Sequence, residues 1–201
     1  MAHLGQVAIW SFDLDAWGEC AQTDSEQMAR AKFARHVRAS VEDLEVHERI
    51  TGPEAVFSQD LLPADDEQIT LTTQILSDQR RRTLALLDAA NDAALDRRDA
   101  TVDQPTWMAW RTPREILRHV VDTESRTYLQ WCGLPRLEPI ADLRDELVRS
   151  AVHVRDAIDT MPRAFTPEHQ GEIWTPVKLL RRLAWHERIE SVFLRRRLRR
   201  R

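Results

Sequence analysis

The hydrophobic and polar positions of this chain follow a two-residue period near its start and a helical period over most of its remaining length. In residues 6–12, Val7 and Ile9 alternate with Ala8 and with larger neighbours. This alternation is typical of a β-strand with one face buried. A turn-forming segment with a glycine follows, and a short second strand is expected through residues 19–22.

Helix and turn signals complete a small module at the start of the chain. Thr23 and Glu26 have the spacing of a capping box, which predicts a helix through about Ser40. The stretches 46–50 and 55–59 flank a Thr-Gly-Pro sequence and predict a hairpin. We therefore expect residues 1–62 to form a small α+β module.

Four long stretches with helical period make up the rest of the chain, which we expect to form a second domain, residues 63–201. They cover about residues 66–96, 112–131, 139–161 and 175–201. The second and fourth begin with Thr-Pro, a combination that is common at helix N-termini. Four amphipathic helices of this length favour a four-helix bundle, so the fold class is mainly α.

Composition and charge narrow the class of protein. The 201 residues are 42% hydrophobic and 31% charged, which is typical of a folded soluble chain. No apolar run is long enough for a membrane helix, and the start lacks the basic and apolar segments of a secretory signal. We expect a cytoplasmic protein with no membrane partner. Six arginines among the last seven residues are interpreted as a solvated helix end, which makes a nucleic-acid partner the weaker alternative.

The fourth helical stretch carries polar residues in its apolar stripe. Leu179, Leu183, His186, Glu190 and Phe193 are spaced by four and three residues, so they share one face that should point into the core. An unpaired charge in such a place is costly, so a compensating partner is expected. Residues four apart on a helix can reach one metal ion.

The second helical stretch offers a third ligand. His119 lies near the edge of the stripe marked by Ile116 and Val120. If this helix lies beside the fourth, then His119, His186 and Glu190 can converge. Two imidazoles, one carboxylate and a vacant position are typical of catalytic zinc and of non-haem iron.

Two motifs resemble the DinB/YfiT-like family of metalloenzymes. They are Trp-x-Thr-Pro-x-x-Ile-x-x-His-x-x-Asp-x-Glu from Trp110 to Glu124 and Trp-Thr-Pro followed by Leu-Ala-Trp-His-Glu-Arg from Trp174 to Arg188. The resemblance covers about residues 66–198. It implies a four-helix bundle with a divalent metal held by three histidines, usually zinc or nickel. Iron is a further candidate only because of the ligand set described above.

The resemblance also implies a reaction class. Family members include S-transferases that use a low-molecular-weight thiol, and hydrolases, so a small-molecule substrate is expected. His119 and His186 match two family histidines, whereas Glu190 stands in place of the third. The site either survives with two histidines and one glutamate or is lost together with its metal.

Several alternatives stay open at this point. Glu124 either orients a histidine or is a solvated helix residue, and Trp110 and Trp185 either line a substrate pocket or fill the core. Residues 6–40 resemble a HicB-like antitoxin domain, which implies a protein partner for the first module. The alternative to an enzyme is therefore a scaffold or regulatory protein with a decayed metal site, and a homodimer is compatible with either.

Overall fold

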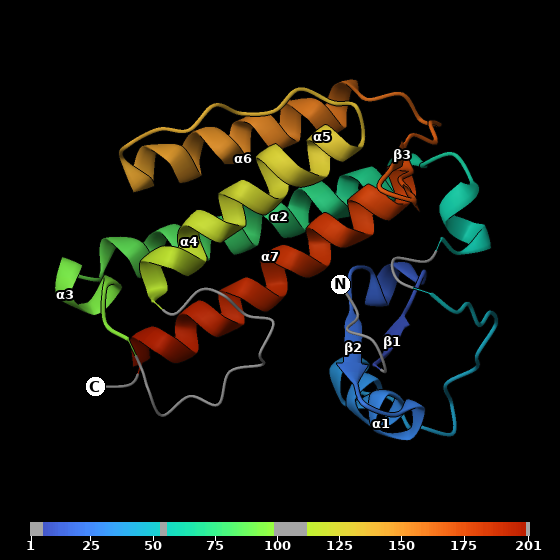
Figure 1. Cartoon of the computed structure of the whole chain (residues 1–201). Coiled ribbons are helices and arrows are strands. Elements are labelled where there is room, and N and C mark those ends of the chain that lie inside the picture. The colour runs from blue at the N-terminus through green and yellow to red at the C-terminus, as the bar shows by residue number, and fades with distance from the viewer. Residues whose placement is uncertain (1–5, 53–55, 99–111, 200–201) are drawn as a thin grey trace. The chain divides into compact units, whose positions relative to one another are not determined.

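The computed structural model describes residues 6–52, 56–98 and 112–199, and it is mainly helical, with two small two-stranded sheets (Figure 1). The chain divides into two compact units. The first combines residues 1–72 with 161–185, and the second combines residues 73–160 with 186–201. Two long helices, α2 (Asp66–Asp88) and α7 (Pro176–Arg199), contribute to both units. Each unit is built from separate stretches of chain. The division predicted from the sequence, into residues 1–62 and 63–201, stays a prediction.

The first unit begins with the expected pair of strands, which are antiparallel and place Val7 opposite Thr23. Its shorter elements are β1 (Val7–Trp10), η1 (Leu14–Ala16), β2 (Cys20–Thr23), α1 (Glu26–Val37), η2 (Ser58–Leu61), β3 (Glu168–His169) and β4 (Glu172–Ile173). The cap of α1 differs from expectation: the hydroxyl of Ser25 accepts from the Met28 N–H at 3.3 Å. Thr23 cannot serve as the cap because it belongs to β2 and its hydroxyl donates to the Ser25 carbonyl.

The hairpin predicted across residues 46–59 is wrong. No strand forms in the described parts of this stretch, and Ser58–Leu61 is a 3₁₀ turn. The reason lies in Asp60, whose carboxylate accepts from the Phe57 N–H at 3.1 Å and binds Arg181. These contacts hold a tight turn where an extended strand was expected.

Gly18 lies at a close approach of two elements within the first unit. Its φ is +71°, and a Cβ added there would lie 2.5 Å from the Cβ of Ala184 on α7. Only glycine satisfies both the backbone conformation and the contact. The small core beside it is formed by Ala16, Ala21 and Phe33.

The second unit holds the remaining helices. They are α3 (Asp92–Leu95), α4 (Pro113–Val121), the π-helical segment η3 (Asp122–Tyr128), α5 (Leu129–Trp131) and α6 (Leu143–Thr160). The helix predicted over 66–96 is interrupted, because Asn91 caps α3 by accepting from the Ala94 N–H at 2.9 Å. The second predicted helix is confirmed from its Thr112 cap to Trp131, as the consecutive elements α4, η3 and α5.

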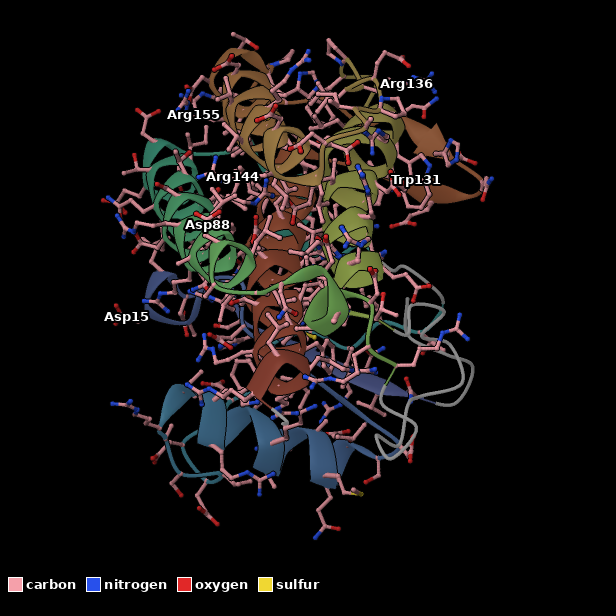
Figure 2. The ribbon with its side chains drawn as sticks, turned by 90° about the vertical axis from the view of Figure 1, so that its left-hand side faces the viewer. Asp15, Asp88, Trp131, Arg136, Arg144 and Arg155 are labelled. Carbon is pink, nitrogen blue, oxygen red and sulfur yellow. The ribbon has the colours of Figure 1, made fainter. Side chains whose placement is uncertain are left out.

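Within the second unit, α4, α6 and the later parts of α2 and α7 run alongside one another (Figure 1). Arg144 of α6 hydrogen-bonds to Asp88 of α2 at 2.8 Å, and the two side chains point toward each other in Figure 2. The apolar core between these helices consists of Leu87, Leu95, Ile116, Leu117, Val121, Leu143, Leu147 and Leu194.

The arginine-rich end of α7 is less solvated than predicted. Arg197 is only 6% exposed, and its carbonyl accepts from the Arg97 guanidinium at 3.4 Å. The helix continues through Arg199, and Leu194 belongs to the core, so this end is held against the unit. Among the described helices, none has both the length and the apolar character needed to cross a bilayer.

Candidate metal centre

Two helices of the second unit carry the three side chains that the sequence analysis selected. His119 lies in the last turn of α4, a helix fixed at its start by a capping box between Thr112 and Glu115. His186 and Glu190 lie one turn apart on α7. Both α7 residues are buried, at 3% and 4% exposure, and His119 is partly buried. The expected burial of polar residues in the α7 stripe is confirmed.

The three side chains converge. The Nε2 atoms of His119 and His186 lie 3.2 Å apart, and Nε2 of His119 lies 3.9 Å from Oε1 of Glu190. One ligand atom from each residue lies within 4.8 Å of the other two. In a tetrahedral site with ligand bonds of about 2.05 Å, ligand atoms are about 3.4 Å apart. The two imidazole nitrogens are already close to this spacing, whereas Oε1 of Glu190 is about 0.5 Å too far from Nε2 of His119.

Glu190 is the side chain that most needs a cation. Its Oε2 is buried and makes no hydrogen bond with any residue that the structure places. Burial and, to a smaller extent, the nearby Glu124 and Glu187 raise the pKa of Glu190 to about 8. An unpaired buried carboxylate is unfavourable, and a bound cation would reverse that cost.

Both histidines suit the role of neutral nitrogen ligands. Burial, followed by the proximity of His186, lowers the pKa of His119 to about 3. His186 is oriented through its other nitrogen, because Nδ1 lies 2.9 Å from Oε1 of Glu124. An ionised carboxylate only accepts, so Nδ1 then carries the proton and Nε2 keeps its lone pair toward His119. Such a contact is the usual way in which a metal-binding imidazole is held in place.

Glu124 is itself part of a buried ion-pair network. It is fully buried, and Arg80 of α2 donates to its Oε2 at 2.9 Å. Arg80 also donates to Oε1 of Glu187 at 2.8 Å and to the Leu147 carbonyl at 2.6 Å. Burial raises the pKa values of Glu124 and Glu187 and Arg80 partly offsets this rise, so that both come to about 7. Of the two alternatives for Glu124, orienting a histidine agrees with the geometry and a solvated helix residue is wrong.

The charges of this cluster are unequal. When ionised, Glu124, Glu187 and Glu190 carry three negative charges against the single guanidinium of Arg80. One divalent cation would bring the total to zero. Charge balance and donor chemistry therefore agree with the fit of a divalent metal to these residues.

Some residues of this cluster were not selected from the sequence. Arg80 and Glu187 were missed because charged residues on a helix are usually solvated. Tyr128 was also missed; its ring lies edge-on to His186 with centroids 5.9 Å apart. A sequence signal for Arg80 does exist: it lies three residues before Thr83 and seven before Leu87, which places it on the buried side of α2.

The two tryptophans proposed for a substrate pocket have different outcomes. Trp110 lies outside the described residues. Trp185 belongs to the first unit, where its ring lies edge-on to Trp10 with centroids 5.5 Å apart. A role for either ring beside the metal ligands stays a prediction.

Comparison of the chain with family models, with curated proteins and with solved structures finds no match.

Proposed function

We propose that this protein is a metal-dependent enzyme with a DinB-like four-helix bundle, in which His119, His186 and Glu190 hold one divalent ion. The observation that carries the proposal is the convergence of these three ligand atoms within 4.8 Å of one another. Zinc and nickel fit two imidazoles and one carboxylate, and ferrous iron also accepts this set. The proposed reaction is thiol transfer or hydrolysis on a small molecule, with a low-molecular-weight thiol as the co-substrate in the first case.

The chemistry that a divalent ion supplies in such a site is Lewis acidity, which lowers the pKa of a bound water or thiol. The residues of the chain have separate tasks. His119 and His186 donate neutral nitrogens, and Glu190 contributes negative charge. Glu124 holds the His186 ring through Nδ1, and Arg80 holds Glu124 in turn. The His186 ring is therefore held in place before any ion arrives, which reduces the entropic cost of binding.

A second candidate function is a scaffold or regulatory protein without metal. Arg80 already pairs with Glu124 and Glu187, so this part of the cluster would be stable as a structural ion-pair network. In that case the HicB-like first module would recruit a protein partner. The two candidates differ in what Glu190 does, because only the enzyme needs its carboxylate to bind a cation.

Metal content of the protein purified without a histidine tag tests the proposal. We expect close to one zinc, nickel or iron per chain by elemental analysis, and less than a tenth of that in His186→Ala. His153→Ala is the matched control, because His153 contacts the Pro135 carbonyl and lies outside the cluster. Metal-free protein whose melting temperature does not change on addition of zinc or nickel would instead support the scaffold.

Catalysis is tested on the metal-loaded protein. A nitrophenyl ester reports hydrolysis, and a chlorodinitrobenzene electrophile with a small thiol reports thiol transfer. We expect turnover in one of these assays that is lost in His186→Ala and kept in His153→Ala. Full metal content with no turnover in either assay would leave a metal-binding protein and reject the reaction class.

A further inference from the structure

The first unit contains a cavity of about 320 Å³ that the proposed metal chemistry does not use. This volume is at the small end of the range of ligand pockets. The rings of Trp10, Phe57 and Trp185 line the cavity together with Arg181 of α7. These residues all belong to the first unit, so the cavity is formed within one compact unit.

The guanidinium of Arg181 is fixed through two of its three nitrogens. Nε and Nη2 donate to the two carboxylate oxygens of Asp60 at 2.7 and 2.6 Å, and both residues are almost fully buried. The Cζ atom of Arg181 also lies 4.5 Å from the ring centroid of Trp10 and 5.3 Å from that of Phe57. Asp60 and the two rings therefore hold the guanidinium in place at the wall of the cavity.

The third nitrogen of Arg181, Nη1, is a donor without an acceptor. It is buried and makes no hydrogen bond with any residue that the structure places. A buried donor that is left unpaired is unfavourable, and more so when it belongs to a charged group. An acceptor that reaches Nη1 from the cavity would remove this cost. A change of rotamer in the wall has to admit that acceptor, and such changes are common on binding.

The group that Nη1 lacks is an acceptor and not a counter-ion. Asp60 already pairs with Arg181 through both carboxylate oxygens. What Nη1 still needs is one oxygen with a free lone pair at about 2.9 Å. A carbonyl oxygen has this property and accepts close to the plane of its own group, so a flat carbonyl compound suits the donor.

The rest of the wall favours a flat ring. Trp10 and Trp185 meet edge-on at 67°, and Phe57 adds a third ring to the lining. Aromatic rings in stacked or edge-on contact stabilise one another beyond the area that they bury. The Cys20 thiol also lines the cavity, but burial raises its pKa to about 12, so no thiolate forms at neutral pH. The wall therefore favours binding over covalent reaction.

We infer that this cavity binds a small planar aromatic compound that carries a carbonyl group. The ring packs against the aromatic wall, and the carbonyl oxygen accepts from Nη1 of Arg181. Both features are needed for tight binding. A ring without the carbonyl leaves the buried donor unpaired, and a carbonyl compound without a flat ring loses the contacts with Trp10, Phe57 and Trp185.

Titration with three uncharged ring compounds tests the inference. Benzamide has the flat ring and the carbonyl, aniline has the ring without the carbonyl, and cyclohexanecarboxamide has the carbonyl without the flat ring. Benzamide is expected to bind with a dissociation constant below about 1 mM by calorimetry, and the other two at least tenfold more weakly. Equal binding of aniline would reject the hydrogen bond, and equal binding of cyclohexanecarboxamide would reject the aromatic contacts. No binding of benzamide would overturn the inference as a whole.

Variants locate the binding site. Ala8 lines the cavity, so Ala8→Leu fills part of it and should weaken benzamide binding at least tenfold. Ala93→Leu is the matched control, because Ala93 is exposed on α3 of the other unit. Unchanged affinity in a folded Ala8→Leu protein would overturn the inference.

A second variant addresses the hydrogen bond. Arg181→Lys keeps a cation beside Asp60 and removes Nη1, so benzamide should bind to it no more tightly than aniline does. Arg144→Lys is the control, because Arg144 lies on α6 of the other unit and pairs with Asp88 (Figure 2). Full benzamide affinity in Arg181→Lys would reject the hydrogen bond. If that variant does not fold, the comparison of benzamide with aniline on the unmodified chain decides.

The inference is separable from the proposed metal chemistry. Benzamide should bind with the same affinity to protein treated with a chelator and to protein loaded with zinc. Binding that requires zinc would place the carbonyl on the metal and would overturn this assignment. A protein that binds no metal but still binds benzamide, and loses it in Ala8→Leu, would support the inference and reject the proposed function.

Discussion

Replacing Glu190 by glutamine should change stability and metal binding in opposite directions. The substitution keeps the shape of the side chain and removes a charge that is buried at 4% exposure. Without metal, the variant should be more stable than the unmodified protein at pH 8. With metal, it should bind roughly a hundredfold more weakly or worse, because an amide is a poor substitute for a carboxylate ligand.

The size of the stability change follows from the pKa of Glu190, which burial raises from 4.5 to about 8. The folded state holds this proton more tightly than the unfolded state. The favourable contribution of the protonated carboxyl is therefore complete below pH 4.5 and is lost as the pH rises to about 8. At about 1.4 kcal/mol per pKa unit, the metal-free protein loses on the order of 3–5 kcal/mol over this window. Glutamine does not ionise, so Glu190→Gln should avoid this loss.

Urea unfolding of metal-free protein at pH 5 and at pH 8 measures the effect. The two proteins should have similar stability at pH 5, and the variant should be the more stable one at pH 8. Glu146→Gln is a control of opposite sign. Burial acts to raise the pKa of Glu146, but hydrogen bonds from the Ile140 N–H, Arg126 and Arg118 outweigh it and lower the pKa overall.

The Glu146 carboxylate therefore stabilises the fold above its unfolded pKa, so Glu146→Gln should destabilise the protein at pH 8. Equal stability of Glu190→Gln and unmodified protein at pH 8 would refute the reasoning on burial. Retention of stoichiometric metal by Glu190→Gln would refute its role as a ligand.

Three further substitutions test other contacts. Glu124→Gln should weaken metal binding about 10–100-fold by loosening the His186 ring, and a metal titration that matches the unmodified protein would contradict this. Arg80→Met should cost about 3–5 kcal/mol in urea unfolding at pH 8, because it leaves two buried carboxylates without their cation, and a neutral result would mean that both are protonated. Gly18→Ala should lower the free energy of unfolding by at least about 2 kcal/mol, because the added Cβ would lie 2.5 Å from Ala184. Gly133 has the same φ of +71° but open space around it, so Gly133→Ala should lower the free energy of unfolding by only about 1 kcal/mol. Equal losses would show that backbone conformation alone decides.

Local signals predicted several helices and the side chains that converge in the candidate metal centre. The Thr112 cap and the start of α7 are determined by residues adjacent in sequence, so they can be predicted without knowledge of the fold. His186 and Glu190 were found because a four-residue spacing puts both on one buried face. Arg80 was not found, because its burial depends on two carboxylates that lie 44 and 107 residues away.

Longer-range organisation was harder to predict for the same reason. The turn at Ser58–Leu61 depends on the pairing of Asp60 with Arg181, 121 residues further on. The stretches on either side of the Thr-Gly-Pro sequence cannot report such a partner, so they were interpreted as a hairpin. The division into two units, each assembled from separate stretches, likewise depends on contacts that no local pattern encodes.

The π-helical segment η3 explains how one long helical stretch keeps the same face inward. The buried residues of the stretch from α4 through η3 to α5 form two rows with a spacing of four residues. One row is Ile116, Val120, Glu124, Tyr128 and Cys132, and the other is Leu117, Val121, Ser125 and Leu129. In a regular α-helix each step of four residues drifts by about 40°, so Ile116 and Cys132 would lie about 160° apart. The wider turn, closed by the Leu129 N–H on the Glu124 carbonyl, takes up this drift. A π-helical turn holds about one residue more than an α-helical turn, so removing one residue from Asp122–Tyr128 would let the segment wind as an ordinary α-helix and leave Leu129 and Cys132 facing the core. Inserting one more residue would instead rotate both by about 100° and turn them away from the core that they now complete.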